Sequence, residues 1–198
     1  MKNGTLLIIA LVVFSLNSIY GQDISALEKG MGFRDIKLGG YIFDYDCFVK
    51  DNAERSMMRG ITGEPVHDVY RFVLNEKYPY DKIGDLSIYM LLVKVNYGQI
   101  YEIKIFLEPN NRILELLTYK YGRCTEYNKD LFPTYYWRTK NGIQLAFMGP
   151  DISGVKSYTL TYLNLNLYEQ GKLAAKKSRA KAQSEREKKL RSEAQSQF

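Results

Sequence analysis

Histidine, cysteine and tryptophan are scarce in this chain, and their scarcity excludes most catalytic chemistry. The 198 residues include one His, two Cys and one Trp. A Ser-His-Asp triad or a typical zinc site would have to use His67, which follows Val66 in a strand-like segment. The sequence has no nucleophile-elbow, zinc-protease, phosphate-loop or dinucleotide-binding motif. We therefore expect a protein that is not an enzyme and that holds no metal or cofactor, with His67 in a structural or surface role.

Carboxylates offer the one remaining route to catalysis. Asp44, Asp46 and Asp51 look like part of a calcium loop, but the sixth position holds Val49 where that loop needs Gly and the twelfth holds Arg55 where it needs Glu, so a solvated acidic turn is the better interpretation. Paired carboxylates can also hydrolyse glycosides without histidine. A hydrolase that uses Asp44, Asp46 or Asp68 is the weakest hypothesis that we retain, because no spacing in the sequence selects a pair.

The chain lacks an apolar run long enough to span a membrane, but it begins with a shorter one. Lys2 precedes an unbroken apolar segment at residues 6–14, and the chain then becomes more polar up to Gly21. That layout is typical of a secretory signal peptide, whereas a membrane-spanning helix needs about 20 apolar residues. We predict cleavage after Gly21, export to the periplasm or the extracellular space, and no transmembrane span in the mature chain. An uncleaved anchor is the alternative, because Ile19 stands where a small residue is preferred.

Both cysteines, Cys47 and Cys124, lie in the part of the chain that is predicted to be exported. An even number of cysteines in an oxidising compartment favours a disulfide. A bond between them would stabilise the fold by about 4 kcal/mol in the chain-entropy description. The alternative is a pair of thiols that pack as small apolar side chains.

Positive charge is concentrated at the C-terminal end. Residues 171–198 hold nine Lys or Arg and three Glu, so this tail carries the same +6 as the whole chain, and residues 22–170 carry −1. A nucleic-acid-binding domain needs a basic face, so the near-neutral body excludes that class. The tail contains good helix formers without a continuous apolar stripe. We predict a solvated helix or a disordered tail, which either serves only solubility or contacts an anionic envelope surface or an acidic partner.

Hydrophobic periodicity predicts one α+β domain. Strand-like alternation occurs at residues 66–74, 87–97, 100–107, 134–139, 143–148 and 155–164, and helical patterns occur at residues 23–29, 52–59 and 111–121. Asn141-Gly142 predicts a hairpin. We expect a two-layer fold, with an antiparallel sheet of about six strands, one or two helices on one face and a wetter second face. The domain would span residues 22–168, after a signal peptide at 1–21 and before a basic tail at 169–198.

Tyrosine is the most abundant aromatic residue, with 17 copies. The best candidates for an interface are clustered in two short segments of the sequence, and they are Tyr78, Tyr80, Tyr135, Tyr136 and Trp137. Tyr and Trp are favoured anchors at interfaces. Strand alternation explains Trp137 equally well as a core residue, so both interpretations stay open.

The segment at residues 33–39, Phe-Arg-Asp-Ile-Lys-Leu-Gly, precedes the predicted sheet and helix. It resembles small exported bacterial α+β proteins, among them the outer-membrane-assembly lipoproteins and the β-lactamase-inhibitor-like modules. Those proteins typically continue from Ile-x-x-Gly into Met or Thr and a second helix, whereas Gly39-Gly40 continues here into Tyr41, and the lipid-anchoring Cys is missing. The resemblance implies a non-catalytic envelope module that contacts other proteins, and it transfers no site residue.

Three functional hypotheses remain. The leading one is an exported, non-catalytic module that acts by contact with a protein or with the envelope. The second is a small carbohydrate- or peptide-binding domain that uses a tyrosine-rich sheet face. The third is the carboxylate-based hydrolase.

Overall fold

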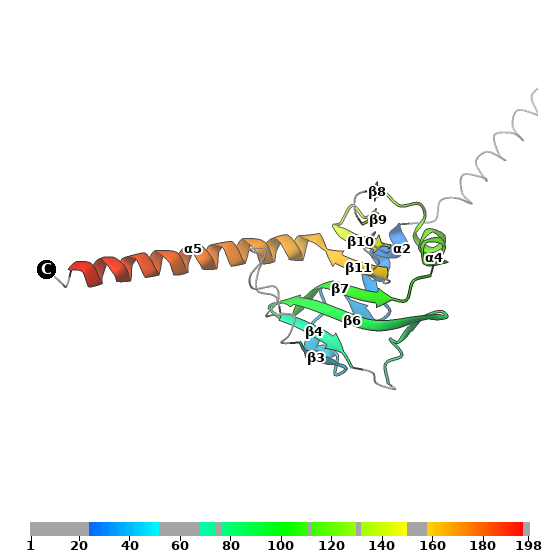
Figure 1. Cartoon of the computed structure of the whole chain (residues 1–198), viewed down its shortest axis with the longest axis horizontal. Coiled ribbons are helices and arrows are strands. Elements are labelled where there is room, and N and C mark those ends of the chain that lie inside the picture. The colour runs from blue at the N-terminus through cyan, green and yellow to red at the C-terminus, as the bar shows by residue number, and fades with distance from the viewer. Residues whose placement is uncertain are drawn as a thin grey trace, which may run out of the picture.

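The computed structural model describes residues 24–51, 68–73, 77–110, 112–129, 132–149 and 158–195. In chain order its elements are α2 (Ser25–Gly30), β1 (Gly32–Phe33), β2 (Ile36–Lys37), the 3-10 helix η1 (Ile42–Asp44), β3 (Phe48–Lys50), β4 (Asp68–Phe72), β5 (Lys82–Ile83), β6 (Leu86–Asn96), β7 (Gln99–Leu107), α4 (Arg112–Tyr121), β8 (Glu126–Asn128), β9 (Thr134–Arg138), β10 (Ile143–Met148), β11 (Tyr158–Asn164) and α5 (Leu165–Gln195). The fold is α+β, as predicted (Figure 1).

Within the described residues, one sheet dominates the structure. Its strand order is β3-β4-β6-β7-β11-β10-β9-β8, with β5 paired to β6, and every pairing is antiparallel. The strands β1 and β2 form a separate two-stranded sheet. The six predicted strands are all present, but the described sheet has nine, so the expected number was wrong. The additional strands β3, β5 and β8 have two or three residues each, which is too short for an alternating pattern to reveal.

The main core lies between the central strands and the helices α2 and α4. Val93, Ile103 and Leu145 are fully buried on the face of the sheet that α4 covers. The helix α4, which matches the predicted helix at residues 111–121, buries Ile113, Leu117 and Tyr121 along one side. The side chain of Asn110 caps this helix by accepting a hydrogen bond from the Arg112 N–H at 2.9 Å, and Gly122 follows its end with φ 79°.

The second face of the sheet is less exposed to solvent than predicted. Leu92 and Lys94 point away from the main core and are nevertheless buried. The ammonium group of Lys94 lies 3.1 Å from the carboxylate of Glu102, its cross-strand neighbour on β7, and this pairing allows the charge to be buried. The first turns of α5 pack on the same side of the sheet, where the rings of Tyr168 and Tyr101 have centroids 6.0 Å apart.

Helix α5 begins at Leu165, directly after the predicted strand at residues 155–164, and it has 31 residues. At 1.5 Å per residue it is about 46 Å long. Only its first turns contact the sheet, and the rest projects away from the domain (Figure 1). Of the two forms predicted for the tail, the structure has the helix.

None of the helices in the described ranges is long and apolar enough to cross a membrane.

Several predictions lie outside the described residues, among them the signal peptide at residues 1–21, the helix at residues 52–59 and the role of His67.

The predicted bond between Cys47 and Cys124 is absent, since both cysteines are free. Cys47 immediately precedes β3 and Cys124 precedes β8, and these strands form the two opposite edges of the sheet. Seven strand spacings separate the edges, which is about 34 Å along the sheet, whereas bonded cysteines need Cα atoms within about 7 Å. Cys47 is buried in the core cluster and Cys124 packs against it. The alternative of two packed thiols therefore describes the structure.

Candidate binding surfaces

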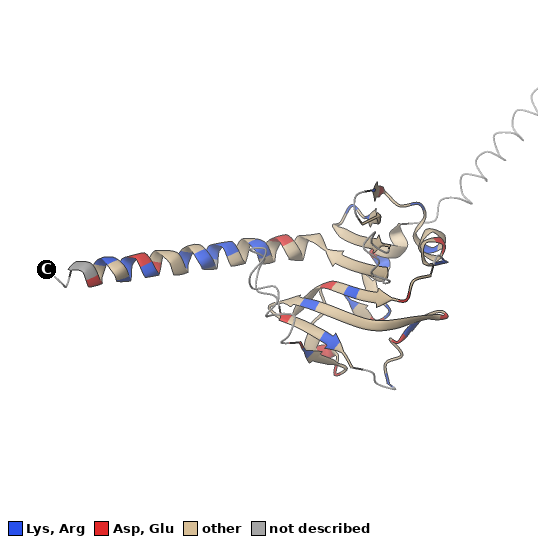
Figure 2. Ribbon diagram, in the orientation of Figure 1, with Lys and Arg blue, Asp and Glu red and all other residues tan. Residues whose placement is uncertain are grey.

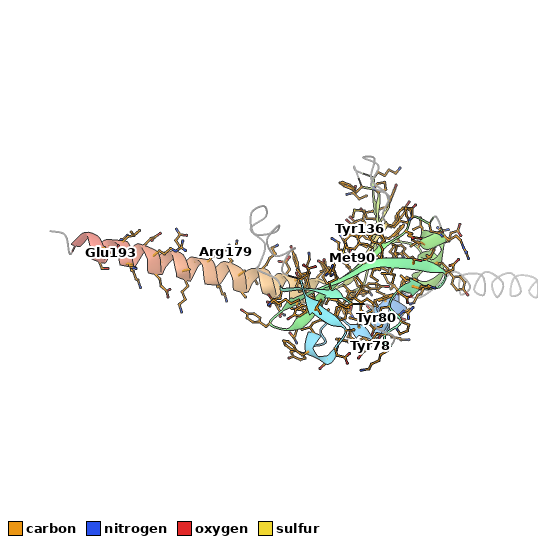
Figure 3. The ribbon with its side chains drawn as sticks, turned by 60° about the horizontal axis from the view of Figure 1, so that its bottom comes forward. Tyr78, Tyr80, Met90, Tyr136, Arg179 and Glu193 are labelled. Carbon is orange, nitrogen blue, oxygen red and sulfur yellow. The ribbon has the colours of Figure 1, made fainter. Side chains whose placement is uncertain are left out.

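The five predicted interface residues do not form one surface. Tyr78 and Tyr80 lie beside β4, with ring centroids 5.5 Å apart, whereas Tyr135, Tyr136 and Trp137 belong to β9 on the far side of the central strands. Figure 3 shows Tyr136 on the opposite part of the domain from Tyr78 and Tyr80. Sequence proximity suggested two segments, but only the strand order shows that they are separated.

Two of these five residues belong to the core. Tyr80 is 2% exposed and Trp137 is 0% exposed. The hydroxyl of Tyr80 donates to the carboxylate of Asp35 at 2.6 Å, and burial together with this hydrogen bond raises the pKa of Tyr80 well above its usual range. The indole N–H of Trp137 donates to the carbonyl of Gly122 at 2.9 Å. Neither side chain can contact a partner, so the core interpretation of Trp137 is the correct one and Tyr80 is removed from the interface.

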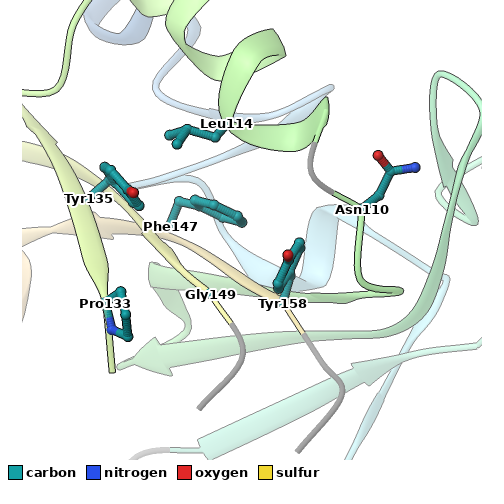
Figure 4. Close-up of a pocket in the computed structure, with 7 residues that line it drawn as sticks. All are labelled: Asn110, Leu114, Pro133, Tyr135, Phe147, Gly149 and Tyr158. Atoms are coloured by element: carbon teal, nitrogen blue, oxygen red, sulfur yellow. The ribbon is translucent and has the colours of Figure 1, made fainter. Parts of the chain in front are cut away.

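Tyr135 lines a small pocket between α4 and the strands β9, β10 and β11. The pocket has a volume of about 370 Å³, and its walls include Asn110, Leu114, Pro133, Tyr135, Phe147 and Tyr158 (Figure 4). The ring of Tyr135 stacks on Tyr127 at 4.6 Å and lies nearly parallel to Phe147 at 6.1 Å. Burial, and then a hydrogen bond with Tyr127, raises the pKa of Tyr135. Aromatic walls of this kind suit the flat apolar face of a small ring.

Two of the three acidic residues that were considered for catalysis, Asp46 and Asp68, pair with cations, and the third, Asp44, is exposed. Asp46 lies 3.1 Å from the ammonium group of Lys77, and Asp68 lies 2.9 Å from that of Lys50. Hydrogen bonds from Tyr78 and then from Lys77 lower the pKa of Asp46. The described residues include no group of three or more His, Cys, Asp or Glu side chains placed to hold a metal ion. These contacts are those of a solvated, ion-paired surface.

Helix α5 presents the largest concentration of charge on the protein. The described side chains from Lys176 to Glu193 are all exposed, and Lys and Arg outnumber Glu along this stretch (Figure 2). Figure 3 shows Arg179 and Glu193 on the part of the helix that is remote from the sheet. Ion pairs within the helix, such as Lys189 with Glu193 at 3.8 Å, support it locally. From Gly171 onward the helix carries three times as many cations as anions, so its net charge is strongly positive.

A second group of aromatic residues, which the sequence analysis did not single out, is strongly exposed. The aromatic cluster consists of Tyr41, Phe43 and Tyr97, which are 51%, 79% and 85% exposed. The segment around η1 meets the β6–β7 turn through a bridge between Tyr41 and Gln99, and the Ile42 N–H donates to the Gly98 carbonyl at 2.9 Å. The sequence feature that could have identified this cluster is the two-residue turn Tyr97-Gly98, where a bulky aromatic residue occupies a position that favours Asn.

No protein-family model, curated protein or solved structure matches the chain. The resemblance of residues 33–39 to exported envelope proteins therefore stays a prediction.

Proposed function

We propose that the protein is an exported, non-catalytic binding module, and that α5 contacts an anionic surface of the cell envelope. The observation that carries the proposal is the exposed, basic stretch of α5 that projects from a nearly neutral body. Residues 1–21 predict export, which would bring the protein to the periplasm or the extracellular space.

The electrostatic attraction between α5 and an anionic membrane is strong enough to support binding. Each Lys or Arg close to an anionic membrane surface contributes about 1 kcal/mol, and the attraction falls off within the Debye length of about 8 Å at physiological salt. A helix that stands clear of the domain can bring several cations within that distance at once. Because α5 lacks a continuous apolar stripe, we expect it to lie on the headgroups without inserting.

The test is sedimentation with phosphatidylcholine vesicles, with and without phosphatidylglycerol, using protein that starts at Gln22. We expect binding only to the anionic vesicles, and weaker binding as salt rises from about 0.05 to 0.5 M. Changing Lys176, Lys177 and Lys181 to Gln should weaken binding by at least about tenfold. The matched control changes the same three residues to Arg, which keeps both the charge and the helix propensity.

The proposal fails if the protein binds neutral and anionic vesicles equally, or binds neither. It also fails if the Gln and Arg variants bind alike, because the charge of α5 would then have no role.

A second candidate function is the binding of a small carbohydrate or peptide. It is favoured by the pocket of about 370 Å³ between α4 and β9–β11, whose aromatic walls include the half-buried Tyr135. A glycan and peptide array should give signals that Tyr135→Ala abolishes and that Tyr119→Ala, which changes an exposed tyrosine of α4, does not. An array without signal would remove this candidate.

A further inference from the structure

We propose that the aromatic cluster of Tyr41, Phe43 and Tyr97 inserts into the interfacial layer of an anionic lipid bilayer while α5 lies on the headgroups. This inference rests on the proposed function and adds to it the part of the protein that contacts the apolar region of the surface.

The exposure of the cluster is the first observation. Isolated exposed apolar residues are common on protein surfaces, whereas neighbouring large ones indicate a binding surface. The rings of Phe43 and Tyr41 lie against Gly98, the residue after Tyr97, since a Cβ added to Gly98 would lie 3.1 Å from Phe43 and 3.7 Å from Tyr41. Together with Tyr41 they present three rings from two backbone segments that are bonded to each other. These rings are therefore held in place before any partner arrives.

Backbone strain at Tyr97 is the second observation. Tyr97 has φ 50° and Gly98 has φ 81°, and a two-residue hairpin turn with positive φ at both positions favours Asn-Gly. A bulky side chain in this conformation is unusual and costs free energy. The ring recovers little of that cost by burial, since it is 85% exposed. Strain that is retained without a packing benefit is typical of a functional position.

The position of the cluster at the base of α5 is the third observation. Gly171 is buried, and a Cβ added there would lie 2.9 Å from the side-chain nitrogen of Asn96, the residue before Tyr97. The helix therefore leaves the domain beside the turn that carries Tyr97. Figure 1 shows the β6–β7 turn and the start of α5 on the same side of the domain. One membrane surface can therefore contact the aromatic cluster and α5 at the same time.

The chemistry of the combined surface matches a lipid bilayer. Aromatic rings are favoured at the headgroup level of membranes, and cations are favoured above an anionic leaflet. Stable attachment to a membrane needs two such signals, and α5 lacks an apolar face of its own. The exposed carboxylate of Asp44, next to Phe43, limits insertion to the interfacial layer because a charge is costly in the hydrocarbon core.

Tryptophan substitution tests the insertion directly. The native Trp137 is 0% exposed, so lipid quenchers cannot reach it. In Phe43→Trp and in Tyr97→Trp, we expect the added fluorescence to shift to the blue and to be quenched by anionic vesicles that contain brominated lipids. Tyr119→Trp is the matched control, because Tyr119 is 75% exposed on α4 at the other side of the domain (Figure 1), and it should stay unquenched.

Binding measurements separate the two proposals. The double variant Phe43→Ser, Tyr97→Asn should bind anionic vesicles at least about tenfold more weakly than the native chain, and Tyr119→Ser should bind normally. Salt-sensitive binding without quenching at positions 43 and 97 would overturn the inference and leave the role of α5 intact. Absence of binding to anionic vesicles would overturn both. Equal quenching at all three positions would also overturn the inference, since contact would then not be specific to the cluster.

Discussion

Replacing Tyr97 with Asn should stabilise the protein, although it removes a large side chain. A left-handed conformation costs a typical L-residue about 1–2 kcal/mol, and Asn tolerates this conformation better than most residues. The ring is 85% exposed, so its removal sacrifices little buried area. We expect the free energy of unfolding to rise by about 0.5–1 kcal/mol, which corresponds to an increase in Tm of about 1–4 °C for a domain of this size.

Urea denaturation and calorimetry of the native chain, Tyr97→Asn and Tyr97→Ala measure this effect. Alanine keeps most of the left-handed strain, so Tyr97→Ala should give no comparable gain. Gly98→Ala should act in the opposite direction, because the position has φ 81° and the new Cβ would approach the ring of Phe43 to 3.1 Å. A loss of stability in Tyr97→Asn would show that the expected strain is not released, and that the ring contributes packing that its exposure does not indicate.

Three further predictions concern the interior. Glu102→Ala should destabilise the fold by about 3 kcal/mol in urea denaturation, because it leaves the charge of Lys94 buried without its carboxylate; changing both residues to Met should cost less, and an equal cost would contradict the role of the pair. Trp137→Ala should lower stability by about 4 kcal/mol, and a loss below about 1 kcal/mol would show that Trp137 is not a core residue. Burial raises the pKa of Cys47 from 9.0 to about 11, so the unfolded thiol ionises first and stability should fall as pH rises through this window. Cys47→Ala should flatten this dependence of stability on pH, and a thiol reagent should label Cys124 before Cys47. A reductant should leave Tm unchanged, whereas a fall in Tm on reduction would indicate that the two thiols are bonded.

The long strands could be predicted from the sequence because each contains several alternating residues. The predicted strand at residues 143–148 matches β10, and the segment at residues 87–97 matches β6 within one residue at each end. The hairpin at Asn141-Gly142 is also present, although only Gly142 has a positive φ. The strands β3, β5 and β8 were not predicted, because two or three residues are too few to show an alternating pattern. Their pairing depends instead on the neighbouring strands.

The binding surfaces were harder to predict, because they depend on residues that are distant in sequence. Tyr41 and the β6–β7 turn that carries Tyr97 come together through the bridge between Tyr41 and Gln99. The separation of Cys47 from Cys124 follows from the strand order, which local patterns do not contain. The charge of α5, in contrast, was evident from composition, since it needs no tertiary contact.

Hydrogen exchange of the chain from Gln22, measured with and without vesicles that contain phosphatidylglycerol, would map the proposed membrane contact along the whole chain. We expect slower exchange in two places, the β6–β7 turn with the neighbouring η1 segment, and the projecting part of α5. Unchanged exchange in both places, or protection confined to the pocket beside α4, would contradict the proposed membrane contact.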